Sequence, residues 1–113
     1  IKSGTIRPCT TEINVTELRY ILCRRAGPER AKQVVRGLLE SGYLKVVSAS
    51  SLAEEASLVK CKRSISLADC FTIALAEKLQ TKLLLAKHEK ELDAEIKKHP
   101  FDTGILFLDD LLK

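Results

Sequence analysis

The first half of the chain carries apolar residues at helical spacing in two consecutive segments. In residues 14–27 they recur three or four positions apart, and Gly27 with Pro28 supplies the stop. A second helix is expected to begin at Pro28 and to be closed by Gly42. The apolar positions are Val15, Leu18, Ile21 and Leu22 in the first helix and Ala31, Val34, Val35, Leu38 and Leu39 in the second.

Three further helices are expected in the second half. Residues 50–63 form one, started by a capping box from Ser51 to Glu54. Residues 66–80 are apolar on nearly all sides, which is typical of a central helix covered by other elements. Residues 88–99 are polar and are stopped by Pro100, as in a surface helix.

Short apolar runs between these helices predict strands. Residues 6–13 form an extended segment confined by Pro8, and residues 43–48, 82–86 and 104–108 are rich in aliphatic side chains. Strands that alternate with helices and are apolar throughout indicate parallel pairing with helices on both faces. The predicted fold class is therefore α/β, in one domain over residues 1–113.

Composition excludes several classes of protein. Hydrophobic residues make up 45% of the 113 residues, but no apolar run approaches the roughly 20 residues that a membrane span needs. The net charge of +4 is compatible with a nucleic acid partner without proving one. Four cysteines without a CxxC spacing argue against a zinc site, and with no secretory signal a cytoplasmic location is expected.

Carboxylates stand where a ligand site is expected in a parallel sheet. Such a site lies beyond the carboxyl ends of the strands, where the next helices begin. Glu17 follows the first extended segment, Asp69 opens the central helix, and Glu89 follows the third strand. Because clustered carboxylates repel one another unless a cation neutralises them, their convergence would predict a site for Mg²⁺ or Mn²⁺.

Each acid also has a purely structural explanation. Glu17 follows Asn14, and Asp69 follows Ser66, at the spacing of a capping box. Glu89 is surrounded by other acids on a helix that faces solvent. Taken singly, each is more often a helix cap or a solvated charge than a ligand, and only the combination favours a site.

At this point the chain resembles a known family. The segments "NVTELRYIL", "SLADCFTIALAEKL" and "TKLLLAKHEKEL" are similar, in this order, to the body of a PIN domain of the VapC toxin type. The resemblance implies a three-layer α/β/α sandwich around a central parallel sheet, and RNA cleavage with Mg²⁺ or Mn²⁺. By resemblance Glu17 and Asp69 match the second and third acids of the family, and Glu89, or Asp93 in its place, matches the fourth.

The resemblance also implies partners and supporting residues. It predicts an RNA substrate, an antitoxin protein and a homodimer. A metal-activated water would hydrolyse the phosphodiester, and Asn14 would orient a water or a carboxylate, although helix capping explains Asn14 as well. Phosphates of RNA could be contacted by Arg24, Arg25, Lys60, Lys62 and Arg63, which an ordinary solvated basic face explains equally well.

One departure from the family concerns the start of the chain. The first acid of the family is an Asp that ends an N-terminal strand, and this sequence begins at Ile1 without Met and without that strand. The expectation is a PIN-like domain lacking its first strand and helix, with roughly 25 to 40 further residues upstream, the size of a strand and its crossover. Without that strand the sheet would have a central gap.

Two other readings remain open. Residues 16–47 also have the order of a winged-helix DNA-binding module, in which Gln33 and Arg36 would contact bases. Alternatively the chain is a PIN fold that has lost catalysis and serves as a scaffold, as the irregular fourth acid and the missing first acid suggest.

Overall fold

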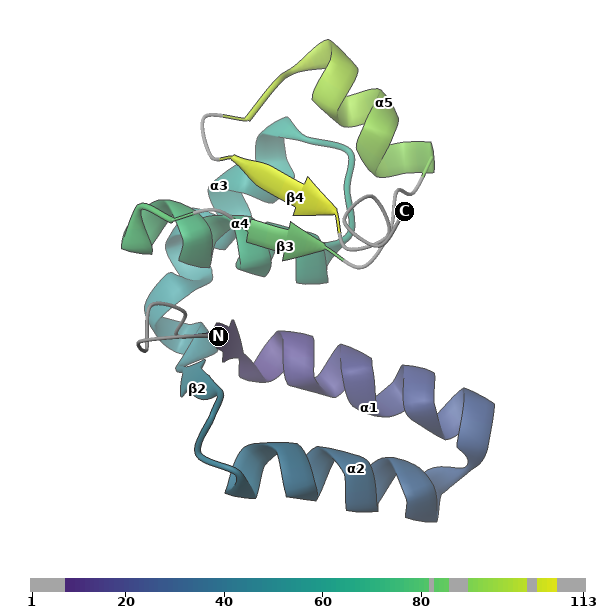
Figure 1. Cartoon of the computed structure of the whole chain (residues 1–113). Coiled ribbons are helices and arrows are strands. Elements are labelled where there is room, and N and C mark those ends of the chain that lie inside the picture. Colours follow the sequence, from purple (N-terminus) through teal and green to yellow (C-terminus); the bar gives the residue numbers. More distant parts are fainter. Residues whose placement is uncertain (1–7, 82, 86–89, 102–103, 108–113) are drawn as a thin grey trace. The chain divides into compact units, whose positions relative to one another are not determined.

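The computed structural model of the chain describes residues 8–81, 83–85, 90–101 and 104–107 (Figure 1). It divides into two compact units, residues 1–51 and 52–113. Each unit contains one pair of parallel strands together with its own helices.

The first unit is a helical hairpin framed by two strands. Strand β1 (Cys9–Thr11) leads directly into helix α1 (Glu12–Ala26), which is followed by α2 (Pro28–Glu40) and β2 (Lys45–Val47). The strands β1 and β2 pair in parallel, with Cys9 opposite Lys45 and Thr11 opposite Val47. Figure 1 shows α1 and α2 side by side, joined by a tight turn.

Gly27 makes that turn possible. Its φ of 90° is a backbone conformation that side chains with a Cβ rarely adopt, and its N–H donates to the carbonyl of Cys23 at 2.9 Å. Pro28 then starts α2 in the position where its missing N–H costs nothing. Val15 of α1 and Ala31 and Val35 of α2 are buried and form the core of the hairpin.

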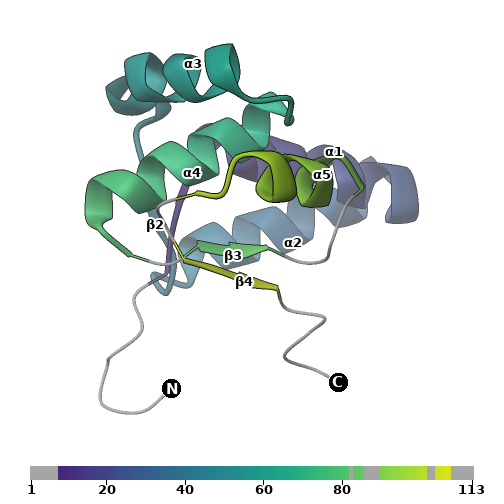
Figure 2. The same cartoon turned by 90° about the horizontal axis from the view of Figure 1, so that it is seen from above.

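The second unit starts in a 3₁₀ turn η1 (Ala49–Leu52), which spans the boundary between the units. Helices α3 (Ala53–Lys62) and α4 (Leu67–Leu79) follow, then β3 (Leu83–Leu85), α5 (Lys90–Lys98) and β4 (Ile105–Phe107). Strands β3 and β4 pair in parallel, with Leu83 opposite Ile105 and Leu85 opposite Phe107. In Figure 2, α4 lies between α3 on one side and β3 with β4 on the other.

Helix α4 is the centre of this unit, as its composition predicts. Six of its residues are buried, and the apolar surface they remove from water contributes on the order of 1.5 to 3 kcal/mol for each large side chain. Ser66 caps its start, and Gln80 ends it with a φ of 52°. The buried residues are Cys70, Phe71, Ile73, Ala74, Leu75 and Ala76.

The α/β fold class and the parallel pairing of the strands are confirmed. Three local predictions are wrong. The first helix begins at Glu12 rather than Asn14. The capping box from Ser51 to Glu54 does not form, because α3 starts after Leu52 and the Ser51 hydroxyl donates to the Ser48 carbonyl. Finally, the described strands form two sheets of two strands rather than one continuous sheet.

Candidate active site

The start of α1 is fixed by Thr11, the last residue of β1. Its hydroxyl accepts the N–H of Asn14 at 3.3 Å and donates to the Asn14 side-chain oxygen at 2.7 Å. Thr11 is fully buried, and its side chain is the N-cap of the helix. Asn14 therefore lies inside the first turn and partners the cap instead of being the cap.

Glu12, an acid in the first turn of α1, has a structural role. The Glu12 carboxylate accepts the backbone N–H of Ala49 at 2.6 Å, which ties the start of α1 to the segment just after β2. The sequence pattern does not reveal this contact, because a helix start at Asn14 leaves Glu12 in the preceding strand. A Thr followed directly by Glu would have predicted a helix that starts at Glu12 with Thr11 as its cap, since acids are favoured in the first turn.

Glu17 lies in the second turn of α1 and is half-buried. With Thr11 as the cap, Glu17 is too far along the helix to reach the unpaired N–H groups of its start. The capping-box explanation of Glu17 is thereby wrong. What remains is a partly buried carboxylate one turn beyond the carboxyl end of β1.

Asp69 lies in the first turn of α4, where the Ser66 hydroxyl accepts its backbone N–H at 3.2 Å. The Ser66 half of the predicted capping box is therefore confirmed. A negative side chain here is also favoured by the helix dipole. In Figures 1 and 2, α4 runs antiparallel to β3, so the start of α4, whose first turn contains Asp69, lies toward the end of β3.

The charge of Asp69 acts on the neighbouring thiol. Burial raises the pKa of Cys70 above its ordinary value, the ammonium of Lys60 lowers it, and the Asp69 carboxylate raises it again. Lys60 also donates to the carbonyl of Ile65 at 2.6 Å, just before the helix cap. The start of α4 thus carries the acid Asp69, with the basic side chain of Lys60 from α3 close to it.

The fourth acid is only partly described. Glu89, the first choice from the sequence, lies outside the described residues. Asp93, the alternative, lies half-buried in the first turn of α5. Glu91 lies in the same turn but is exposed, so Asp93 is the more buried of the two acids at the start of the helix that follows β3.

The donor chemistry suits a hard cation, since carboxylate oxygens are what Mg²⁺ and Mn²⁺ prefer. Within the described residues, however, no group of three or more His, Cys, Asp or Glu side chains is close enough together to hold a metal. Glu17 belongs to the first unit, and Asp69 and Asp93 belong to the second. The convergence of these acids therefore stays a prediction.

The predicted basic residues differ in exposure. Arg24, Arg25 and Lys62 are exposed, and the Arg24 guanidinium lies 4.9 Å from the ring centroid of Tyr20. Lys60 is exposed but donates to a carbonyl of its own unit. Arg63 is engaged in internal contacts, which give it a structural role and do not support its predicted contact with RNA.

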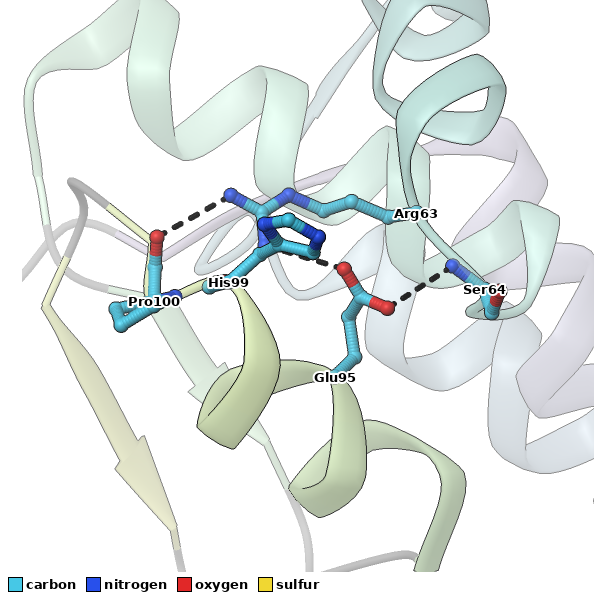
Figure 3. A network of polar contacts seen from close by, with 5 residues as sticks. All are labelled: Arg63, Ser64, Glu95, His99 and Pro100. Carbon is cyan, nitrogen blue, oxygen red and sulfur yellow. Dashed lines mark hydrogen bonds and ion pairs between the residues drawn. The ribbon is translucent and has the colours of Figure 1, made fainter.

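Those contacts join Arg63 to α5 (Figure 3). The guanidinium lies 3.4 Å from the Glu95 carboxylate, donates to the carbonyls of His99 and Pro100, and stacks 3.7 Å from the ring centroid of Phe101. The other oxygen of Glu95 accepts the N–H of Ser64 at 3.2 Å. Sequence alone did not indicate Glu95, which looks like one more solvated acid but is buried.

Comparison with protein families identifies the family of the chain. The PIN domain model matches residues 2–94. The chain belongs to the PIN domain family. The matched region contains α1 with Glu17, α4 with Asp69, and the first turn of α5 with Asp93. PIN domains are generally nucleases and usually use divalent metals, so membership indicates a nuclease-type function.

A search of curated proteins finds no match to this chain. The winged-helix reading is disfavoured by the family and by the sheet, because β2 pairs in parallel with β1 and so is not a strand of an antiparallel wing. Gln33 and Arg36 are exposed on α2. Across the described part of the chain, none of the helices has the length and apolar character to span a bilayer.

Proposed function

We propose that this PIN domain is a metal-dependent endoribonuclease that hydrolyses phosphodiester bonds of RNA. The observation that carries the proposal is the family match, which includes both helices that bear the best-placed acids, α1 and α4. The oxygen-rich set of donors supports a requirement for Mg²⁺ or Mn²⁺.

Glu17 and Asp69 would hold the metal, together with Glu89 or Asp93. When bound, the metal would supply an activated water and neutralise the charge that develops on the phosphate. The position of Glu17 supports this role, because it is a half-buried carboxylate one turn beyond the carboxyl end of β1.

Asp69 would combine two tasks. Its backbone N–H completes the cap by Ser66, while its carboxylate would bind the metal from the first turn of α4. The helix dipole favours the ionised form of a carboxylate in this first turn, which is the form that binds a cation. Asn14 lies in the first turn of α1, where it is hydrogen-bonded to Thr11, and would orient a carboxylate or a water from there.

The biological role we propose is that of the toxin of a toxin–antitoxin pair, acting in the cytoplasm as a homodimer. Exposed apolar side chains on the first unit, Tyr20, Ile21 and Leu39, support protein contacts there. Arg24, Arg25 and Lys62 are exposed and available to phosphates of the RNA.

The experiment uses the full chain with a fluorescently labelled single-stranded RNA, in EDTA and with Mg²⁺ or Mn²⁺. Cleavage should require the metal and be lost in Glu17→Gln and Asp69→Asn, but not in Glu77→Gln, which removes the same charge from an exposed position on α4. A chain that neither binds Mn²⁺ saturably nor cleaves RNA would support the inactive-scaffold alternative. Cleavage that persists in EDTA would overturn the metal requirement.

A further inference from the structure

The Glu95 network consists of Arg63, Ser64, Glu95, His99 and Pro100 (Figure 3). It connects the linker between α3 and α4 to the second half of α5. Glu95 is 5% exposed and the Arg63 side chain 19% exposed, so the ion pair is largely removed from water. A buried charge is retained only with good partners, and each oxygen of Glu95 has one.

The contacts also join neighbouring residues of the linker to one point of α5. Arg63 contacts Glu95 and, beyond it, the carbonyls of His99 and Pro100, and Ser64 also contacts Glu95. Glu95 stands two positions after Asp93 on the same helix. Ile65 is buried next in the chain, and Ser66 then caps α4 with Asp69 in the first turn.

The linker is held from both sides. Glu95 binds its first part from α5, and Lys60 binds the carbonyl of Ile65 from α3. Between Ser64 and Asp69 the chain is thus held by the Ser64 N–H, by the carbonyl and the buried side chain of Ile65, and by the Ser66 cap. Loss of the Glu95 contact would release the segment that sets where α4 begins relative to α5.

From this geometry we infer that Arg63 and Glu95 are positioning residues for the nuclease site, fixing Asp69 on α4 relative to Asp93 on α5. The inference rests on the proposed function, since it needs a metal site to which Asp69 contributes. Neither residue would touch metal or RNA. They act through the linker, as partners behind metal ligands commonly do.

The decisive variant is Glu95→Gln. Its amide oxygen can still accept the N–H of Ser64, but the charge that pairs with Arg63 is lost. Mn²⁺ binding to the full chain would be measured by the EPR signal of unbound Mn²⁺, in the absence of RNA. The expected result is an apparent dissociation constant for Mn²⁺ raised about 10-fold, the lower end of what loss of such partners costs.

Arg63 provides an independent second variant. Arg63→Lys keeps the charge but loses the planar fork that reaches Glu95 and the two carbonyls, so an intermediate weakening is expected. Arg63→Met removes charge and fork and should weaken Mn²⁺ binding as much as Glu95→Gln. Should Glu95→Gln fail to fold, by far-UV circular dichroism, the variants at Arg63, whose side chain is less buried than that of Glu95, still test the inference.

Two controls separate positioning from general effects. Glu77→Gln removes a negative charge from an exposed site of the same unit, and Val35→Ala lowers stability by emptying part of the core of the first unit. Both should leave the dissociation constant for Mn²⁺ unchanged at temperatures well below unfolding. RNA cleavage in the Glu95 and Arg63 variants should fall in kcat, with the KM for RNA nearly constant.

The outcomes distinguish the two proposals. Wild-type protein that binds no Mn²⁺ and cleaves no RNA removes the proposed function and this inference with it. Wild-type binding with unchanged affinity and kcat in folded Glu95→Gln and Arg63→Met overturns the positioning role alone. Weakening of the same size in Val35→Ala would also overturn it, because the effect would then follow stability.

Discussion

Thr11 and Asn14 hold each other at the junction of β1 and α1. The Thr11 hydroxyl accepts the backbone N–H of Asn14 at 3.3 Å and donates to the side-chain oxygen of Asn14 at 2.7 Å. These two hydrogen bonds set the first residue of the helix. The consequence extends to Glu17, which a helix start at Asn14 would have made a capping residue. With the start at Glu12, the same carboxylate has no part in the cap.

Thr11→Ala should lower the free energy of unfolding by about 1 to 2 kcal/mol, because it removes the hydroxyl that makes both hydrogen bonds of the cap, together with a buried methyl group. Thr11→Ser keeps the hydroxyl and should recover most of that loss. Urea denaturation followed by circular dichroism measures both. Equal stability of the alanine and serine variants would show that the hydroxyl does not cap α1.

Glu17→Gln and Glu12→Ala should have opposite consequences. Glu17→Gln should change stability by no more than about 0.5 kcal/mol while lowering RNA cleavage. Glu12→Ala removes the acceptor of the Ala49 N–H and should cost roughly 1 kcal/mol. Comparing unfolding curves and cleavage rates of the pair shows which acid is structural. A large loss of stability in Glu17→Gln would return that residue to a structural role.

At the start of α4, Asp69→Asn should lower cleavage more than about 100-fold, since removing even a group behind a metal ligand costs 10-fold to 100-fold. Its backbone N–H still bonds to Ser66, so the fold should persist. Ser66→Ala is the companion variant and should lower stability by about 1 kcal/mol while leaving the carboxylate. If Asp69→Asn instead keeps full activity, the acid serves only the helix.

The exposed pair Arg24 and Arg25 tests the RNA surface. If both contact phosphates, replacing both by Gln should reduce the slope of log affinity against log salt by about 1.4, at roughly 0.7 per contact on single strands. Affinity would be measured by fluorescence anisotropy in EDTA to prevent cleavage. Lys97→Gln with Lys98→Gln removes the same charge from exposed sites on α5 and serves as control. An identical loss of slope in both double variants would indicate a nonspecific effect of net charge.

Local pattern predicted the elements well and the long-range contacts poorly. Each α-helix and strand of the described chain coincides with a segment whose periodicity or apolar run indicated it, apart from the two residues by which α1 starts earlier, because spacing alone determines which residues share a face. The helix start at Thr11 was missed because Asn14 is an equally good cap by residue type. Glu95 was missed because its burial depends on Arg63 and Ser64, which lie more than thirty positions away in sequence. The pairing of strands into two sheets likewise depends on tertiary packing rather than on any one segment.

Cys70 gives the stability of the fold a predictable dependence on alkaline pH. Burial raises the pKa of its thiol, so the unfolded chain, with a cysteine pKa of about 8.5, loses the proton before the folded chain does. The contribution of this group is therefore fully present below the unfolded pKa and is lost as pH rises through the folded pKa. Under reducing conditions, the free energy of unfolding from urea titrations should fall between pH 8 and pH 10 less steeply for Cys70→Ala than for wild type.

The alanine variant should be less stable at pH 7, because a small cavity replaces the sulfur. Cys61→Ala, which removes an exposed thiol, should keep the wild-type slope. If the free energy of unfolding falls equally with pH in wild type and in Cys70→Ala, burial does not hold this thiol in its protonated form.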